Sequence, residues 1–225
     1  MVDFLVITAH PDDEAAVAGL LLKAKASGCT TGLICLTQGE SGGFAARQQR
    51  IAELHKAVHL LHLDYFKLLD FPDAGIEFTT EGVERLIPLL RESEARTVLT
   101  IHPEDYHPDH RAVSQLVDRS LFVAGLNKYS DEGETWHPSQ VLYFSLDPKS
   151  NPRRADVIVD ISEVMDEKRR VLQSYASQEI ELMLVSWSEQ MGFLGGFRYA
   201  EGYYLKQPLR LENVQALLNS SKSGR

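Results

Sequence analysis

The sequence predicts an α/β fold, a doubly wound, mostly parallel sheet of Rossmann-like type with helices on both faces. Short apolar runs alternate with helical patterns over the first two thirds of the chain, an order typical of parallel sheets covered by helices. The length of 225 residues, with 44% hydrophobic and 24% charged residues, suits one globular domain. We expect a single domain over residues 1–218 and a disordered polar tail over residues 219–225.

The first half of the chain contains the clearest elements. In chain order we expect strand 4–8, helix 15–25, strand 32–36, helix 48–61, strand 65–69, helix 81–92 and strand 97–101. The first strand is an apolar run, and the first helix has helix-forming composition. Glycines mark a loop after the second strand, and the helix at 48–61 places apolar residues at helical spacing.

The second half continues the alternation and then becomes rich in glycine. In chain order we expect helix 112–123, strand 141–146, a turn-rich loop at 149–154, strand 157–159 and helix 163–175. Ser162 is a candidate cap for the last helix. Residues 186–202 combine four glycines with aromatic residues, which predicts a mobile cap or lip.

The composition disfavours several classes of partner. Acidic residues outnumber basic ones by 32 to 23, for a formal charge of -9, so neither nucleic acid nor an anionic membrane surface is an expected partner. No apolar stretch is long enough to span a bilayer, and the N-terminus lacks a basic signal-peptide region. Cys29 and Cys35 are interpreted as reduced, buried small residues, which favours a cytoplasmic location.

Two segments carry most of the chemistry, and both follow predicted strands. Residues 9–14 read Ala-His-Pro-Asp-Asp-Glu, and residues 107–110 read His-Pro-Asp-His. Ligands of open α/β sheets bind beyond the carboxyl ends of the strands, where the strand order reverses. If the first and fourth strands flank that point, the two segments face each other across one crevice.

The first segment has an alternative structural interpretation. Pro11 suits the first turn of a helix, and three acids are favourable near a positive helix N-terminus. Taken alone, the first segment is about equally well explained as a plain acidic helix start or as a functional site. The second segment shifts the balance, because two His and one carboxylate leave a position open, as a catalytic zinc site requires. His10, Asp13 and His110 are the candidate ligands.

The remaining polar residues of the two segments have complementary candidate roles. Asp12 is a candidate general base, since zinc lowers the pKa of its water to about 7. His107 is a candidate for stabilising the oxyanion and passing a proton to the leaving amine. Asp109 is placed to accept a hydrogen bond from one of the histidines and so orient it.

These motifs resemble the LmbE-like (PIG-L) family of zinc N-acetylglucosaminyl deacetylases. The resemblance covers most of residues 1–205 and includes Leu36-Thr37-Gln38-Gly39-Glu40, Arg50-x-x-Glu53, Asp105-Tyr106-His107 and Ala200-Glu201-Gly202-Tyr203. It implies one Zn²⁺ per chain, although Fe²⁺ or another divalent metal is also compatible. It also implies an amino-sugar substrate and a homo-oligomer. Length and the stretch Asp-Tyr-His-Pro-Asp-His-Arg are most similar to the bacillithiol-type branch, whose substrate would be GlcNAc-malate.

The resemblance assigns the site by position. His10, Asp13 and His110 become the metal ligands, Asp12 the general base and His107 the electrostatic catalyst or acid. The chain departs from the family at Gln38, where an arginine is common, and in a histidine-rich helix. These departures leave the catalytic set intact and leave the identity of the substrate open.

Substrate contacts are less specific. Arg50 matches a substrate-binding arginine of the family, whereas Arg47 and Arg198 are equally compatible with surface ion pairs. Tyr106 and Tyr199 are the aromatic candidates for contacting substrate. Aromatic residues in a loop such as 186–202 more often pack the loop down than stack on a sugar.

The other histidines have no assigned chemistry. His55, His59 and His62 could share one helix face and hold a second metal, but no acid or cysteine at suitable spacing completes such a site. We set the odds at roughly four to one that these histidines are surface or interface residues. His102 lies near the predicted crevice and is equally suited to a structural role, and His137 is assigned nothing.

Other functional classes remain as alternatives. Two His and one carboxylate also describe the facial triad of Fe(II) oxygenases, but the adjacent Asp12 is what hydrolysis needs. A sugar- or nucleotide-binding protein without activity, or a metal hydrolase of another amide, would share the fold. The chain lacks the G-x-G-x-x-G, G-x-S-x-G and phosphate-loop motifs, which disfavours a dinucleotide enzyme, a serine hydrolase and a P-loop enzyme.

Overall fold

The computed structural model describes residues 1–129, 134–146 and 154–209. The expected loop at 149–154, apart from Arg154, and the tail at 219–225 lie outside these residues. In the described chain, no helix is long and apolar enough to cross a membrane.

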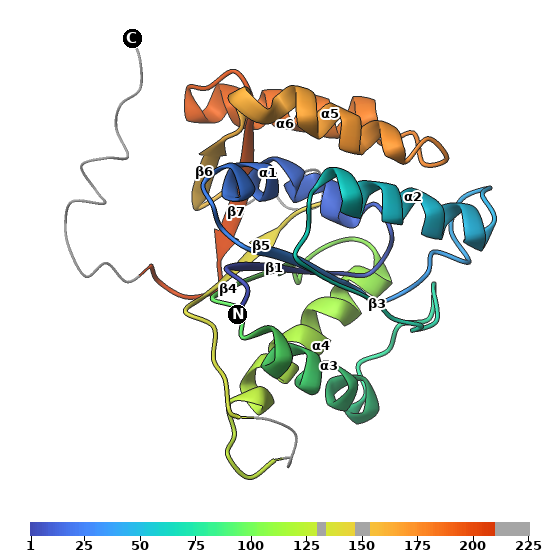
Figure 1. Ribbon diagram of the computed structural model, residues 1–225, viewed down its shortest axis with the longest axis vertical. Coiled ribbons are helices and arrows are strands. Elements are labelled where there is room, and N and C mark those ends of the chain that lie inside the picture. Colours follow the sequence, from blue (N-terminus) through green and yellow to red (C-terminus); the bar gives the residue numbers. More distant parts are fainter. Residues whose placement is uncertain (130–133, 147–153, 210–225) are drawn as a thin grey trace.

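A seven-stranded sheet forms the centre of the protein, in the order β3-β2-β1-β4-β5-β7-β6 (Figure 1). The strands are β1 Phe4–Thr8, β2 Thr31–Cys35, β3 Tyr65–Leu68, β4 Thr97–Ile101, β5 Gln140–Phe144, β6 Val157–Asp160 and β7 Ala200–Leu205. Strands β1 to β5 are parallel, and β7 runs antiparallel to both of its neighbours. The predicted doubly wound, mostly parallel sheet is confirmed.

Helices cover both faces of this sheet (Figure 1). They are α1 Ala18–Ala26, α2 Arg47–Leu60, α3 Thr80–Ser93, α4 Pro108–Ala124, α5 Met165–Ser174 and α6 Glu181–Gly195, with 3-10 turns η1 Asp13–Val17 and η2 Ser162–Val164. Helices α3 and α4 lie on one face, and α1 and α2 lie on the other, with α5 and α6 beyond them. The central strands β1 and β2 are apolar because both of their faces are buried in the core.

The strand order reverses between β1 and β4, as the sequence predicted. From β1 the chain proceeds to β2 and β3 on one side, and from β4 to β5 on the other. The register aligns Val6 with Leu99, so the carboxyl ends of β1 and β4 lie at the same edge of the sheet. Residues 9–14 and 102–110 continue from these two ends, so the topology creates the crevice in which such folds bind ligands.

The region at 186–202 is not a mobile loop, and that prediction was wrong. It forms most of α6 and the start of β7. A side chain at Gly192 would place its Cβ 2.7 Å from the carbonyl oxygen of Arg198, so this glycine allows the chain to pack closely. Gly196 has a φ of 75° and ends α6 in the left-handed conformation. These glycines therefore serve packing and helix termination.

Two predicted helix starts were also wrong. Ser162 does not cap α5, because its backbone N–H and hydroxyl donate to Asp160 Oδ1, at 2.9 and 2.6 Å, and the helix begins with the turn η2. Pro11 does not lie in a first helical turn, because η1 begins only at Asp13. Between them, Asp12 adopts a φ of 109°, a conformation that L-residues other than Asn and Asp rarely adopt.

A buried carboxylate from β7 fixes the start of α1. Glu201 accepts hydrogen bonds from the backbone N–H groups of Gly19 at 2.7 Å and Leu20 at 2.8 Å. It also accepts from Lys168 Nζ at 2.7 Å and from the Tyr203 hydroxyl at 2.6 Å. A carboxylate stabilises the N-terminus of a helix, and this contact connects the last described strand to the helix that follows the first chemical motif.

Candidate active site

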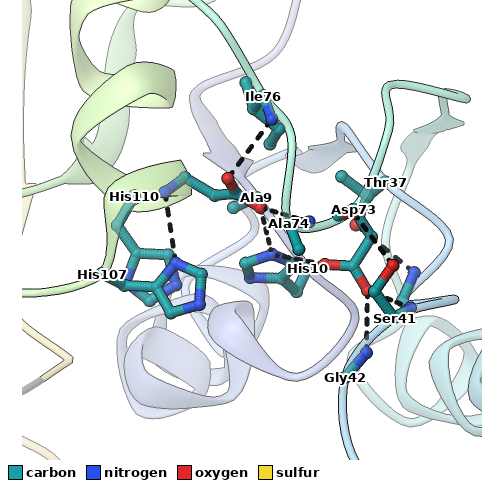
Figure 2. Close-up of polar contacts among 12 residues, drawn as sticks. Ala9, His10, Thr37, Ser41, Gly42, Asp73, Ala74, Ile76, His107 and His110 are labelled. Atoms are coloured by element: carbon teal, nitrogen blue, oxygen red, sulfur yellow. Dashed lines mark hydrogen bonds and ion pairs between the residues drawn. The ribbon is translucent and has the colours of Figure 1, made fainter.

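The fold brings together the two histidine-containing segments, which are about a hundred residues apart in sequence. The rings of His10 and His110 have centroids 5.3 Å apart, and His107 lies 5.0 Å from His10 and 4.5 Å from His110. Figure 2 shows His107 and His110 at the start of α4 beside His10, which follows β1. The three imidazoles therefore form one cluster at the carboxyl edge of the sheet.

His10, Asp13 and His110 are the structure's best candidates for holding a metal ion. All three are buried, and each offers one ligand atom within 4.8 Å of the others. Asp13 Oδ1 lies 3.4 Å from His110 Nε2, and Asp13 Oδ2 lies 3.7 Å from His10 Nδ1. Asp13 Oδ2 also accepts from the backbone N–H groups of Ala9 at 3.1 Å and of His10 at 2.8 Å, which fix the carboxylate in place.

A second group, His10, His107 and Asp109, also satisfies the distances for a metal site. Its members already have other roles, however. Asp109 accepts hydrogen bonds from the backbone N–H groups of Ala74 at 2.8 Å and Ile76 at 3.3 Å, and its own N–H donates to His107 Nδ1 at 3.2 Å. We therefore interpret Asp109 as part of the framework that supports His10, rather than as a ligand.

Carboxylates hold the outward nitrogens of both candidate histidine ligands. His10 Nε2 lies 3.1 Å from Asp73 Oδ1 and 3.1 Å from Asp109 Oδ2, and His110 Nδ1 lies 2.9 Å from Asp105 Oδ1. Such contacts are typical of metal-binding histidines, because they fix the tautomer and make the other ring nitrogen a stronger ligand for the metal. Figure 2 shows Asp73 between His10 and the backbone of Ser41 and Gly42.

The surrounding carboxylates give the cluster an excess of negative charge. Burial alone would lower the pKa of His10, but the hydrogen bond to Asp73 and the charge of Asp13 raise it to about 9. Burial likewise opposes the shift at His110, where Asp13 and Asp105 raise the pKa to about 10. Both histidines lower the pKa of Asp13 to about 2 against the effect of its burial. A cluster that attracts cations this strongly fits a divalent metal in place of the two protons.

Asp12 lies next to this cluster under different constraints. Burial and the charge of Asp13 raise the pKa of Asp12 to about 8, although Arg50 Nη2 lies 3.6 Å from its Oδ2. Its backbone N–H donates to Glu14 Oε2 at 3.2 Å, and the buried Tyr175 hydroxyl donates to Glu14 Oε1. These buried contacts hold Asp12 in its left-handed conformation, the kind of local strain that clusters at functional sites.

His107 is polarised as a hydrogen-bond donor. Burial and the neighbouring His110 lower its pKa, which favours the neutral ring at pH 7. Nδ1 accepts from the Asp109 N–H, so the proton of the neutral ring is on Nε2. The ring thus has an N–H available at the cavity that it lines.

A cavity of about 520 Å³ opens over these groups. Its polar side chains include both predicted histidine ligands, Asp13 and two of the three predicted catalytic residues, Asp12 and His107, together with Asp73. Two predicted substrate contacts, Arg50 and Tyr106, also line it. Arg50 is buried, and its guanidinium donates to the carbonyl oxygens of Pro11 at 2.7 Å and Gly42 at 3.2 Å.

The structure does not place the other predicted substrate contacts in this cavity. Arg47 is exposed and donates through Nε to Gln38 Oε1 at 2.6 Å. Tyr199 is half-buried and packs against the core, with Arg198 over its ring. Asp109 lies behind His10 and does not line the cavity.

Several functional residues were not predicted from the sequence. Asp105 was quoted only as part of a motif, and Asp73 follows β3 without any local signal for its contact with His10. Gln178, Met183 and Trp187 also line the cavity; the sequence assigned no element to residues 176–185, and Trp187 fell in the predicted loop. The remaining histidines give no second site: His55, His59 and His62 are exposed, as expected, and belong to no metal group of the described residues.

Comparisons with known proteins agree on the family. The family profile described as GlcNAc-PI de-N-acetylase (PIG-L) matches residues 5–121. A diacetylchitobiose deacetylase of Thermococcus kodakarensis is 29% identical, covering 88% of this chain and 80% of the relative. A probable N-acetyl-α-D-glucosaminyl L-malate deacetylase 2 of Bacillus subtilis is 30% identical, covering 77% and 82%. The predicted bacillithiol branch is therefore one of several branches that match.

Solved structures agree on the fold. The conserved protein TT1542 of Thermus thermophilus superposes with a TM-score of 0.87 at 30% identity, covering 94% of this chain and 97% of that one. The 4-carboxy-2-hydroxymuconate hydratase GalB of Pseudomonas putida superposes with a TM-score of 0.84 at 23% identity, covering 95% and 99%, a likeness that speaks only for the fold. The profile spans just over half of the chain, and the two sequence relatives named above, which match most of its length, carry deacetylase names, so the protein belongs to the PIG-L family of N-deacetylases.

Proposed function

We propose that this protein is a zinc-dependent hydrolase that removes the acetyl group from an N-acetylglucosamine-type conjugate, releasing acetate and a free amine. The observation that carries the proposal is that Asp12 and His107 line the same cavity as the His10, Asp13 and His110 group. A metal group alone would suit many functions. A carboxylate and a neutral imidazole beside it in one cavity suit amide hydrolysis.

The donor set fits zinc, since two imidazoles and one carboxylate are typical ligands of catalytic zinc sites. When bound, the metal would supply Lewis-acid activation of the amide carbonyl and of water. His10, Asp13 and His110 would hold it, and Asp73, Asp109 and Asp105 would orient the two histidines. Fe²⁺ or another divalent metal would be held by the same residues.

The neighbouring residues would perform the proton transfers. Asp12 would accept a proton from the attacking water, because it lines the cavity next to the proposed ligand Asp13. His107 would donate a hydrogen bond from Nε2 to the oxygen of the tetrahedral intermediate, and the proton taken up by Asp12 would pass to the leaving nitrogen. Arg50 would affect the reaction indirectly. By donating to the Pro11 carbonyl oxygen, it would hold the turn that positions Asp12. Tyr106 is 61% exposed at the rim, where it would contact the bound sugar.

The wider properties of the protein are part of the same proposal. We infer a single catalytic domain over residues 1–218 in the cytoplasm, supported by two free cysteines. A homo-oligomer is supported by the apolar side chains that α6 exposes, among them Leu182, Phe193 and Leu194, which are 80%, 85% and 57% exposed. Light scattering after gel filtration would give the size of the assembly.

The test is a free-amine assay on a panel of N-acetylglucosamine conjugates that includes diacetylchitobiose and GlcNAc-malate. The protein is assayed as purified, after removal of metal with a chelator, and after zinc is restored. We expect amine release that is lost with the chelator and recovered with zinc. Protein that binds one zinc per chain but releases no amine from any conjugate would contradict the proposal and favour another amide or a binding role.

A further inference from the structure

The cavity over the metal group has two chemically different parts. One part is polar and contains the histidines and aspartates of the proposed reaction. The other part is apolar, formed by the side chains of Leu146, Ile180, Met183, Leu184 and Trp187, which we name the apolar wall. A deacetylase acting only on the acetamido group of a polar sugar has no need for an apolar surface of this extent.

Helix α6 supplies three residues of the apolar wall, while Ile180 precedes the helix and Leu146 follows β5. Leu184 is buried and Trp187 packs against the core, so both are held in place by the fold. Met183 lies on the same helix and remains 43% exposed. Apolar side chains that line a cavity gain free energy when a ligand removes them from water. Cavities of ~300–1,000 Å³ hold ligands of drug size, so about 520 Å³ leaves room for a group beside the sugar ring.

The charges around the cavity oppose an acidic group at that position. Among the described residues that line it, three are aspartates and one, Arg50, is a permanent cation. The guanidinium of Arg50 donates to two backbone carbonyls and lies 3.6 Å from Asp12 Oδ2, while its Nε has no hydrogen-bond partner, so most of its contacts are with the turn beside the metal group. Arg47 and Arg198, the other arginines considered as substrate contacts, do not line the cavity.

From these observations we infer the substrate class: an amino-sugar conjugate with an uncharged, apolar aglycone that lies on the apolar wall. The inference rests on the proposed deacetylase function and makes it specific. It disfavours GlcNAc-malate, whose two carboxylates would meet three aspartates and one permanent cation, Arg50, on the described walls of the cavity. It also accounts for Met183 and Trp187, which line the cavity but take no part in the proposed proton transfers.

The first experiment compares three glycosides of N-acetylglucosamine on the zinc-restored protein: methyl, hexyl and malyl. Each fully buried methylene contributes about 0.8 kcal/mol, or roughly fourfold in binding. Because the apolar wall covers only one side of the hexyl group, only part of this gain per methylene is expected. We therefore expect kcat/KM for the hexyl glycoside to exceed that of the methyl glycoside by about tenfold or more. The malyl glycoside should be the poorest of the three.

The second experiment assigns the effect to the wall. Met183→Gln keeps the length of the side chain but makes it polar, and it should reduce the hexyl-to-methyl ratio of kcat/KM by about threefold to tenfold. Glu189→Gln is the control, because Glu189 is exposed on the same helix and does not line the cavity. This control should keep the wild-type ratio.

A binding measurement separates this inference from the proposed function. Calorimetric titration with methyl and hexyl glycosides of glucosamine, the expected products, requires no turnover. Tighter binding of the hexyl amine, weakened by Met183→Gln, supports the apolar wall even if no conjugate is deacetylated. Deacetylation with no preference for the hexyl glycoside, or with a preference for the malyl glycoside, would overturn the inference and leave the deacetylase function intact.

Discussion

Asp105 Oδ1 lies 2.9 Å from His110 Nδ1, and this contact turns the opposite ring nitrogen of His110 toward Asp13. Asp105 is buried and also accepts from the backbone N–H of His107 at 2.9 Å. One carboxylate therefore positions a candidate metal ligand and the start of the helix that carries it.

Replacing Asp105 should weaken metal binding without unfolding the site. In Asp105→Asn the amide is a poorer acceptor for His110 Nδ1–H, so we expect metal affinity to fall by about 10–100-fold. Competition with a chromogenic chelator measures the change. Glu104→Gln, on the exposed neighbour, is the control. Equal affinity in Asp105→Asn and the control would show that Asp105 does not support the metal group.

Asp12 and His110 should have separable effects. Asp12→Asn removes the proposed base but no proposed ligand, so metal should stay bound while kcat falls by about 10²–10⁴-fold. His110→Ala removes a ligand, so metal content and activity should be lost together. Metal analysis beside the amine assay tests both. An Asp12→Asn protein with wild-type kcat would rule out the proposed base.

The buried pair of Lys168 and Glu201 should matter for stability. The two side chains are 1% and 5% exposed, and Glu201 also holds the start of α1. Lys168→Met leaves a buried carboxylate without its cation, which typically costs about 3–5 kcal/mol of unfolding free energy. Urea denaturation measures this loss. Arg169→Met, on the partly exposed neighbour, should cost far less, and similar losses in both variants would contradict the prediction.

Asp64 gives a pH-dependent contribution of known sign. Burial opposes the shift, but hydrogen bonds from Lys25 and from the Thr31 backbone lower the pKa of Asp64 below its ordinary value of 3.8. A lowered folded-state pKa means stability that is present above pH 3.8 and lost as the pH falls through the folded-state value. Asp64→Asn should therefore unfold more easily than wild type at pH 7, by about 0.5–1 kcal/mol given the partial exposure of the pair.

Urea denaturation at pH 7 and at pH 3 or below tests this sign. The difference between wild type and Asp64→Asn should shrink at the lower pH. Glu77→Gln is the exposed control. A difference that grows on acidification would mean that the sign is wrong.

The sheet and the location of the site could be predicted from the sequence, because the patterns that indicate them lie within short continuous segments. The apolar strand β1 and the motif at residues 9–14 are contiguous, and the position of the motif after a strand implies the carboxyl edge. The contact of Asp73 with His10 has no such signal, because it depends on where the loop after β3 returns.

The wrong prediction at 186–202 has a different physical cause. Glycine permits both flexible loops and close packing, and composition does not separate the two. Gly192 is in fact a packing position against the Arg198 carbonyl. Leaving residues 176–185 unassigned and predicting a loop at 186–202 also hid the apolar wall, since Met183 and Trp187 share a side of the cavity only when both lie on one helix.

The position of β7 has a consequence for synthesis of the protein on the ribosome. β7 is the last strand of the described chain, yet it pairs with β5 on one side and β6 on the other. Until residue 205 has emerged, β5 presents an open edge and β6 has no partner strand, while every candidate metal-site residue has already been made. Open edges are templates for association with other chains. A nascent or truncated chain that ends before Ala200 should therefore depend on chaperones, although its chemical motifs are complete.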